Sequence, residues 1–368
     1  MWLWLFGVSA LILSPISTQQ NIGRLYPRCA TSDQRPGQCI PLGDCEFMLN
    51  ILKNNPLSDR ERSYLRANRC GGRTTVILIC CPLQTSIPDA QGLLPLPLQC
   101  GIMNSDRIFG GTQTRIDEYP WMALLAYSKP GNQTGFHCGG TLINNRYVLT
   151  ASHCVNGKTI PKDWKLSGVR LGEWNLASGS DCDLDDCNDS PLDVTIEEFI
   201  SHENYDPQLN DKYNDIALLR LSRNITFTDW VNPICLPLAE SLQSRNFEGI
   251  SLEVAGWGRT ESAKKSDVKL KAFVRGVNSN NCNNVYSGEG VTVKNTQICA
   301  GGEKGVDSCT GDSGGPLMGV DMLNNKTPYY FLAGIISFGP TPCAQLGWPG
   351  IYTRVDRYID WIKRNIRP

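Results

Sequence analysis

The sequence has little of three features that would each point to a common class of protein. Its 368 residues carry 35 basic and 36 acidic side chains, so the formal net charge is -1. A chain this close to neutral has no overall field that attracts nucleic acid or an anionic membrane. Beyond the N-terminus it has no apolar run long enough to cross a bilayer, and only three histidines are available as general bases. We therefore expect no nucleic-acid partner and no membrane anchor.

Cysteine, by contrast, is abundant. The chain has 16, an even number that allows every one to be paired. Because cytosolic thiols are kept reduced, this content indicates an oxidising compartment. The apolar run Met1–Leu13 is too short to span a membrane and predicts a secretory signal over residues 1–18, rather than a buried helix or strand. We expect a secreted, extracellular protein.

Composition divides the rest of the chain into three zones, and the length suits about two domains. Residues 29–81 hold six cysteines. Residues 82–107 contain four prolines, which break helices and central strands, and read as a linker. Residues 108–368 contain many short apolar runs bounded by Gly, Asn or Pro. Such runs predict strands, so we expect this zone to be mainly β.

Three of these runs are the clearest strand candidates, over residues 121–127, 141–143 and 332–337. The C-terminal segment over residues 358–363 instead repeats apolar residues at i, i+3 and i+4, which predicts one amphipathic helix.

Three separated motifs carry the chemistry. Gly311-Asp312-Ser313-Gly314 alone would be weak evidence, since these are ordinary turn residues. However, Thr150-Ala151-Ser152-His153-Cys154 and Asn214-Asp215-Ile216-Ala217-Leu218-Leu219 precede it. Serine is a poor nucleophile that needs a base, itself held by a carboxylate, and the order His, Asp, Ser suits that need. From Ile108 onward the chain resembles the trypsin-like serine proteases, which implies a double β-barrel.

The resemblance assigns each residue a role. Ser313 is the nucleophile, His153 the general base and then acid, and Asp215 the orienting carboxylate. The N–H groups of Gly311 and Ser313 would form the oxyanion hole. The other two histidines, His137 and His202, are expected to be structural or on the surface.

The resemblance also implies a substrate preference. Asp307, six residues before the nucleophile, matches the floor of the primary specificity pocket in trypsin-like members. A carboxylate there pairs with Arg or Lys, and Gly339 and Gly350 match the small residues of the walls. We expect cleavage after Arg or Lys.

Arg107-Ile108-Phe109-Gly110-Gly111 resembles the activation site of the family. Cleavage after Arg107 would free the amine of Ile108 to pair with Asp312 and so order the pocket and oxyanion loop. An arginine at the cut implies an upstream trypsin-like activating protease.

Cysteine pairing in the third zone follows from the resemblance. It implies Cys138–Cys154, Cys282–Cys299 and Cys309–Cys343, with Cys182–Cys187 as a local bridge. Cys235 is then left over, and its natural partner is Cys100 in the linker, which would keep the cleaved enzyme in two joined chains.

The six cysteines of residues 29–81 allow 15 connectivities. A zinc site is an alternative, but the adjacency of Cys80 and Cys81 in a secreted chain favours disulfides. The pattern resembles the clip domain of arthropod clip-domain serine proteases of the easter-like and prophenoloxidase-activating types. This resemblance implies Cys29–Cys80, Cys39–Cys70 and Cys45–Cys81, and a module that docks partners.

The segment over residues 173–187 concentrates oxygen ligands of the kind that calcium prefers. In many relatives the corresponding loop holds calcium, with Glu173 as a side-chain ligand and Asn175 as a carbonyl ligand. Asp181 or Asp183 could close the site. The alternative is a solvated acidic loop pinned by its disulfide. No cofactor is expected for catalysis.

Four Asn-x-Ser/Thr triplets are candidate sites for surface glycans, at Asn132, Asn188, Asn224 and Asn325.

Together these features predict a signal peptide (1–18), a clip domain (29–81), a linker (82–107) and a trypsin-like domain (108–368). We expect a secreted zymogen of an innate-immune cascade, such as melanisation or Toll activation. Its partners would be a downstream zymogen or cytokine precursor, the activating protease and a serpin inhibitor. The alternative is a catalytically silent clip-domain homologue that acts as an adaptor, although silent members usually lack a triad residue.

Overall fold

A computed structural model describes most of the chain from Arg28 onward, and it divides into two compact units at residues 85 and 86. The described residues are 28–32, 36–52, 59–73, 76–82, 92–103, 113–131, 133–158, 160–183, 186–243, 245–259, 265–303, 311–323 and 327–368. The expected signal peptide lies outside them. Among the helices described, none is long and apolar enough to cross a membrane.

The N-terminal unit is a four-stranded antiparallel sheet with two short helices. Its strand order is β1-β2-β4-β3, and Cys45, Met48 and Ile79 form the buried centre. The elements are β1 (Arg28–Ala30), β2 (Pro36–Pro41), η1 (Leu42–Asp44), α1 (Glu46–Leu52), α2 (Asp59–Ala67), β3 (Arg69–Arg73) and β4 (Val76–Pro82). A hydrophobic core this small usually needs disulfide cross-links to make the fold stable. Three disulfides supply it, Cys29–Cys80, Cys39–Cys70 and Cys45–Cys81, in the pairing that the resemblance implies.

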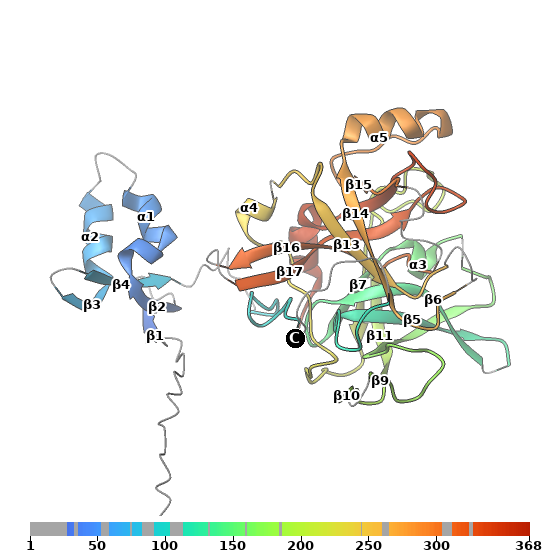
Figure 1. Ribbon diagram of the computed structural model, residues 1–368, viewed down its shortest axis with the longest axis horizontal. Helices are drawn as coiled ribbons and strands as arrows, with labels where there is room; N and C mark the ends of the chain where they lie inside the picture. Colours follow the sequence, from blue (N-terminus) through green and yellow to red (C-terminus); the bar gives the residue numbers. More distant parts are fainter. Residues whose placement is uncertain are drawn as a thin grey trace, which may run out of the picture. The chain divides into compact units, whose positions relative to one another are not determined.

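The second unit contains two closed six-stranded barrels (Figure 1). The first has the order β11-β12-β7-β6-β5-β8 and the second the order β13-β14-β15-β18-β17-β16. Closure leaves neither sheet with a free edge. The strands of the first barrel are β5 (Met122–Lys129), β6 (Gln133–Leu142), β7 (Tyr147–Thr150), β8 (Lys165–Leu171), β11 (Leu192–Ser201) and β12 (Ala217–Leu221). Those of the second are β13 (Ser251–Gly256), β14 (Leu270–Val277), β15 (Gln297–Ala300), β16 (Pro316–Leu323), β17 (Thr327–Phe338) and β18 (Gly350–Arg354).

The remaining elements lie between or after the barrel strands. They are α3 (His153–Asn156), β9 (Cys182–Asp183), β10 (Asp186–Cys187), α4 (Glu240–Gln243), α5 (Ser279–Tyr286), η2 (Ser287–Glu289), η3 (Val355–Tyr358) and α6 (Ile359–Asn365). The strands and the C-terminal helix confirm the mainly β fold predicted from sequence. In the figure, α5 projects from the second barrel (Figure 1).

Buried aromatic side chains join the two barrels. Trp121 is fully buried, and its indole N–H donates to the sulfur of Met318 at 3.1 Å, across a separation of 197 residues. The Tyr119 and Tyr330 hydroxyls both donate to the Glu253 carboxylate, at 2.8 and 3.0 Å from Oε2. A barrel interface filled in this way fixes the relative positions of loops from both barrels.

Four further disulfides brace the second unit: Cys100–Cys235, Cys138–Cys154, Cys182–Cys187 and Cys282–Cys299. These are also the expected pairs. Cys343 is disulfide-bonded as well, and Cys309, its expected partner, lies outside the described residues.

Part of the predicted linker packs as an extension of the second unit. Leu94 and Cys100 are buried, the Gly101 N–H donates to Pro233 O, and the Tyr330 N–H donates to Gly101 O, each at 2.9 Å. The segment over residues 92–103 is thus held by main-chain hydrogen bonds as well as by its disulfide.

Candidate active site

A histidine and a buried aspartate meet between the barrels. His153 opens α3 directly after β7, and Asp215 lies two residues before β12. Strands β7 and β12 pair with each other, so the loops at their ends are neighbours. The Nδ1 atom of His153 lies 2.7 Å from Asp215 Oδ2, and the His153 backbone N–H donates to Asp215 Oδ1 at 2.9 Å. These two hydrogen bonds fix the position of the imidazole ring and keep the proton of the neutral ring on Nδ1, so that Nε2 is available to accept a proton.

Asp215 is fully buried, and further partners hold it. The Ser337 hydroxyl donates to Oδ2 at 2.5 Å, and the Thr353 hydroxyl donates to the Asp215 carbonyl at 2.8 Å. Burial raises the pKa of this carboxyl, but the charge and hydrogen bonds of His153, with that of Ser337, outweigh it and lower the pKa overall. Asp215 is therefore an ionised anchor. Ser337 was missed from sequence, although it adjoins the Phe338-Gly339 pair that marks the specificity pocket.

Ser313 lies on the loop that enters β16, against the first barrel. The Gly139 N–H donates to the Ser313 carbonyl at 2.8 Å, and that oxygen lies 3.5 Å from the sulfur of Cys154, the neighbour of His153. Gly314 has a φ of +80°, and a Cβ there would lie 2.5 Å from the Gly139 carbonyl oxygen. Only glycine lets this loop come so close to β6. The structure thus brings Ser313 beside the His153 segment.

The preceding turn holds the expected oxyanion residue. Gly311 has a φ of +108°, a conformation that glycine adopts without strain. Asp312 points toward the end of β13, where the Gly258 N–H donates to its Oδ1 at 2.7 Å. A Cβ on Gly256 would lie 2.0 Å from the same oxygen, so this stretch admits the carboxylate only because it lacks side chains.

The walls of the expected specificity pocket also come together. A Cβ on Gly339 would meet only the Cα of Gly350, at 3.7 Å, so the two glycines face each other across a short gap. The floor residue Asp307 and the activation residues Arg107 and Ile108 lie outside the described residues.

An open cleft of about 640 Å³ runs past His153 and Gly339. Its lining includes Tyr205 and Lys212 from the loop before Asp215, and Phe338 and Trp348 from the second barrel. A groove of this size between two rigid barrels suits an extended peptide. The described residues contain one compact group of candidate metal ligands, Cys138, His153 and Cys154, but its two cysteines are joined in a disulfide and cannot bind a metal.

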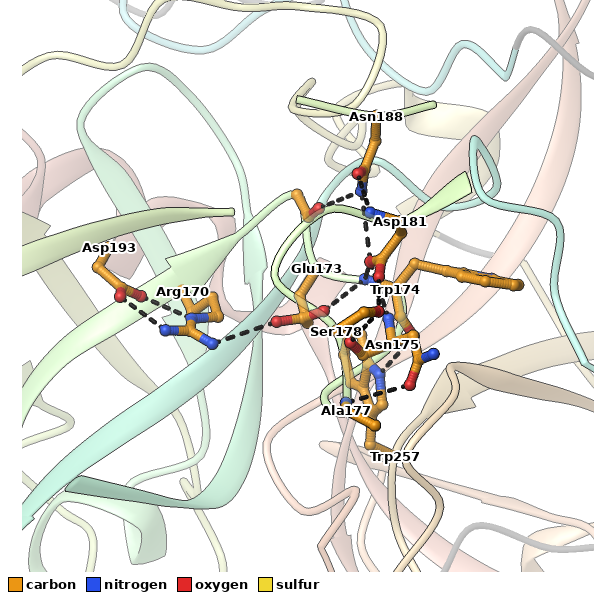
Figure 2. Close-up of polar contacts among 11 residues, drawn as sticks. Arg170, Glu173, Trp174, Asn175, Ala177, Ser178, Asp181, Asn188, Asp193 and Trp257 are labelled. Carbon is orange, nitrogen blue, oxygen red and sulfur yellow. Dashed lines mark hydrogen bonds and ion pairs between the residues drawn. The ribbon is translucent and has the colours of Figure 1, made fainter. Parts of the chain in front are cut away.

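The acidic loop over residues 173–188 forms a dense polar network (Figure 2). Both Glu173 and Asp181 are buried, and an oxygen from each accepts from the Trp174 N–H, at 3.0 and 3.2 Å. Arg170 donates to Glu173 Oε2 at 3.2 Å but makes its two shorter bonds, of 2.7 and 2.8 Å, to Asp193. Burial, and then the charge of Asp181, raise the pKa of Glu173. Two buried carboxylates therefore face Arg170, which bonds mainly to Asp193, and the buried Lys269, whose charge also acts on both of them.

Asn188 belongs to the same network, which corrects one sequence-based prediction. Its side chain is only 6% exposed, its Nδ2 donates to the Gly172 carbonyl at 3.1 Å, and its Oδ1 accepts from the Asp181 N–H at 2.9 Å. A glycan on Nδ2 needs open space, so the predicted surface glycan at Asn188 is wrong for the folded chain. Asn224 is exposed, while Asn132 and Asn325 lie outside the described residues.

The two remaining histidines pack against aromatic rings. His202 stacks on Trp361 with ring centroids 5.3 Å apart, and His137 meets Tyr127 edge-on at 5.9 Å. Burial lowers the pKa of both imidazoles.

Family models match both units. Residues 29–81 match the regulatory CLIP domain of proteinases, and residues 108–362 match trypsin. The chain belongs to the clip-domain serine proteases of the trypsin family, and it is a serine endopeptidase. It is 50% identical over 358 residues to serine protease ea of Drosophila melanogaster, covering 93% of this chain and 91% of the relative.

A second relative, the CLIP domain-containing serine protease HP8 of Bombyx mori, is also 50% identical, with 88% of this chain and 90% of the relative covered. Among solved structures, the Drosophila Grass clip serine protease of the Toll pathway matches with a TM-score of 0.64 and 34% identity, over 92% of this chain and 97% of that chain.

Proposed function

We propose that this endopeptidase is secreted as a zymogen and uses Ser313, His153 and Asp215 as its catalytic triad. The observation that carries the proposal is the buried Asp215 carboxylate, which holds His153 through two hydrogen bonds beside the Ser313 loop. His153 Nε2 takes the Ser313 hydroxyl proton as the oxygen attacks the scissile carbonyl, and then gives that proton to the leaving amine. Water repeats the sequence and releases the acid.

The negative charge that develops on the carbonyl oxygen would be held by the N–H groups of Gly311 and Ser313. Asp307 at the pocket floor would select Arg or Lys, with Gly339 and Gly350 leaving room for the long side chain. The facing approach of these two glycines supports this selection.

Activation would follow cleavage after Arg107, when the Ile108 amine pairs with Asp312. A buried ion pair of this kind is stable only when both partners are in place. We therefore expect the pocket and oxyanion loop to reach their active geometry after the cut, made by an upstream trypsin-like protease.

The relatives suggest where the enzyme acts. A Drosophila relative 42% identical to this chain is named melanization protease 1, and one 39% identical is named Spaetzle-processing enzyme. We propose that this chain works extracellularly in a cascade of that kind and cuts a downstream zymogen or cytokine precursor. The clip unit would dock partners, and a serpin would terminate the activity.

The test is to secrete the full chain, cleave it after Arg107 and assay a peptide substrate with Arg before the scissile bond. We expect activity that is lost on Ser313→Ala and that fails to develop when Arg107→Gln blocks the cut. If the cleaved chain binds cascade zymogens but hydrolyses no Arg or Lys peptide, it is instead an adaptor without catalytic activity.

We also propose that the acidic loop takes a calcium ion. Glu173 and Asp181 supply two buried carboxylates, and the Asn175 carbonyl lies in the same turn. The two cations near them are shared with other carboxylates, Arg170 with Asp193 and Lys269 with Asp117 and Glu118. Such an excess of oxygen charge suits calcium, whose chemistry here would be structural. Glu173→Gln should remove a rise in Tm produced by calcium chloride, whereas Asp193→Asn on the exposed side of Arg170 should not. A Tm that calcium leaves unchanged would favour a loop whose carboxylates are balanced by Arg170 and Lys269.

A further inference from the structure

Lys212 lies in the substrate cleft and has no acidic partner among the described residues. Lys212 is half-buried and lines the same cavity as His153 and Gly339. Its ammonium lies 5.5 Å from the centre of the Phe338 ring. Among the described residues, no carboxylate lies within ion-pair distance of its Nζ atom.

The residues on either side of Lys212 fasten it in place. The Thr292 N–H donates to Asp211 Oδ1 at 2.8 Å, and the Gln297 side-chain amide donates to the Asp211 carbonyl at 2.8 Å. On the other side, the Tyr213 hydroxyl donates to the Thr292 carbonyl. Thr292 lies in the loop that leads into β15, and Gln297 is the first residue of that strand. The backbone on both sides of Lys212 is therefore held by hydrogen bonds of Asp211 and Tyr213, while the Lys212 side chain makes none of these bonds.

The backbone of Lys212 carries strain. Its φ is +45°, a region that residues other than glycine rarely occupy. Strain of this kind persists where the surroundings hold it in place, and it concentrates at binding and catalytic sites. Here it holds the side chain toward the cleft, since the turn is clamped on both sides.

The place of Lys212 relative to a substrate follows from strand geometry. If the Arg or Lys side chain of the substrate lies between Gly339 and Gly350, the side chain of the preceding residue points to the opposite face of the extended peptide. That face is bordered by His153 and by the loop before Asp215, which holds Lys212.

We propose that Lys212 is a specificity-determining residue that favours an acidic side chain immediately before the scissile Arg or Lys. The inference rests on the proposed protease activity and goes beyond it. A half-buried ammonium with no carboxylate partner gains more from a substrate carboxylate than an exposed lysine would. Burial also lowers the Lys212 pKa, although the charge of Asp215 opposes that effect. Lys158 adds to the positive charge of the cleft, whereas Glu289 is the one acidic side chain among the described residues that line it.

The experiment uses the full chain activated by cleavage after Arg107 and three fluorogenic peptides, Ala-Ala-X-Arg, with X as Asp, Asn or Lys. We expect kcat/KM for Asp to exceed that for Asn about fivefold at low salt, and the Lys peptide to be the poorest. The ratio should shrink toward one at 0.5 M salt, since screening weakens partly exposed pairs.

In Lys212→Gln the Asp-to-Asn ratio should fall to about one. Lys294→Gln is the matched control, because Lys294 lies 3.8 Å over the Tyr213 ring of the same turn but outside the cleft lining, and it should keep the wild-type ratio. A wild-type ratio of one or less, or an unchanged ratio in Lys212→Gln, would overturn the inference. Loss of cleavage of all three peptides in the wild type would instead overturn the proposed function.

Discussion

At the scale of single residues, the site depends on groups whose roles come from their surroundings. Asp215 is ionised although it is fully buried, because His153 and Ser337 donate to both of its oxygens. Lys269 is also buried but has a different environment. Burial lowers its pKa to about 8, and Glu118 is the first of four carboxylates whose charges oppose that shift.

Ser337→Ala should lower kcat/KM roughly tenfold, because a hydrogen bond to a charged group contributes about 1.5–3 kcal/mol. The Asp215 pKa should rise, since one of the bonds that lower it is lost. Kinetics on an Arg peptide, together with the acid limb of the pH profile, measure both effects. Thr353→Val is the control, because its hydroxyl bonds the Asp215 carbonyl and not the carboxylate. A profile identical to wild type would contradict the supporting role of Ser337.

Lys269→Met should raise the free energy of unfolding at pH 7 by on the order of 2 kcal/mol. The folded-state pKa of about 8 lies below the usual lysine pKa of 10.5, so below pH 8 both states are protonated and the fold carries the full cost of burying the charge. Between about pH 8 and 10.5 the folded state loses its proton first, so the advantage of the variant should shrink as pH rises.

Lys271→Met is the contrasting control for Lys269. Its Nζ lies 2.5 Å from Glu118 Oε1, and both side chains are buried. Removing that partner leaves a buried carboxylate uncompensated, so this variant should be less stable than wild type. Chemical denaturation from pH 7 to 10 gives both curves. If both variants change stability in the same direction, the contrast drawn between the two lysines is wrong.

At the scale of elements, the loop before β16 meets strands of the other barrel. The Gly139 N–H on β6 donates to the Ser313 carbonyl. The next residue, Gly314, fits between the carbonyl of Gly139 and the hydroxyl of Thr150 on β7. The positive φ of Gly314 and the lack of space for a Cβ atom both disfavour any residue other than glycine at this position. Main-chain contact with the first barrel therefore fixes the position of Ser313.

Gly314→Ala should destabilise the protein by at least about 3 kcal/mol, because strain at positive φ adds to a Cβ that would lie 2.3 Å from Thr150 Oγ1. Gly249→Ala isolates the backbone component, since Gly249 has a φ of +70° with nothing within 4 Å of a Cβ. That control should cost about 1 kcal/mol. Equal Tm losses in the two variants would show that crowding at Gly314 has little effect.

At the scale of the whole molecule, the activation cut divides the chain but does not separate its parts. Cys100 and Cys235 are joined across 135 residues, and the segment before the cut is also bonded to the second unit. The clip unit therefore stays covalently attached to the enzyme after activation.

The cleaved wild type should run as one species on a non-reducing gel and as two after reduction. A Cys100→Ser/Cys235→Ser variant should give two chains under both conditions, because only noncovalent contacts would hold the segment over residues 92–103 and detergent disrupts them. Cys182→Ser/Cys187→Ser, which opens a disulfide spanning five residues, is the control and should behave like wild type. A single non-reduced band from the Cys100/Cys235 variant would mean that another covalent link exists.

The two-unit division, the mainly β fold, the family and the His153–Asp215 pair could all be predicted from the amino-acid sequence. These features depend on local motifs and on cysteine content, which are visible in the order of the residues. The folded chain was needed to show that Ser337, 122 residues from Asp215, is a further partner of its carboxylate, that Asn188 is buried, and that Lys212 lines the cleft. Burial and hydrogen-bond partners arise from contacts between segments that are distant in the sequence. A single residue in the sequence gives no signal of such contacts.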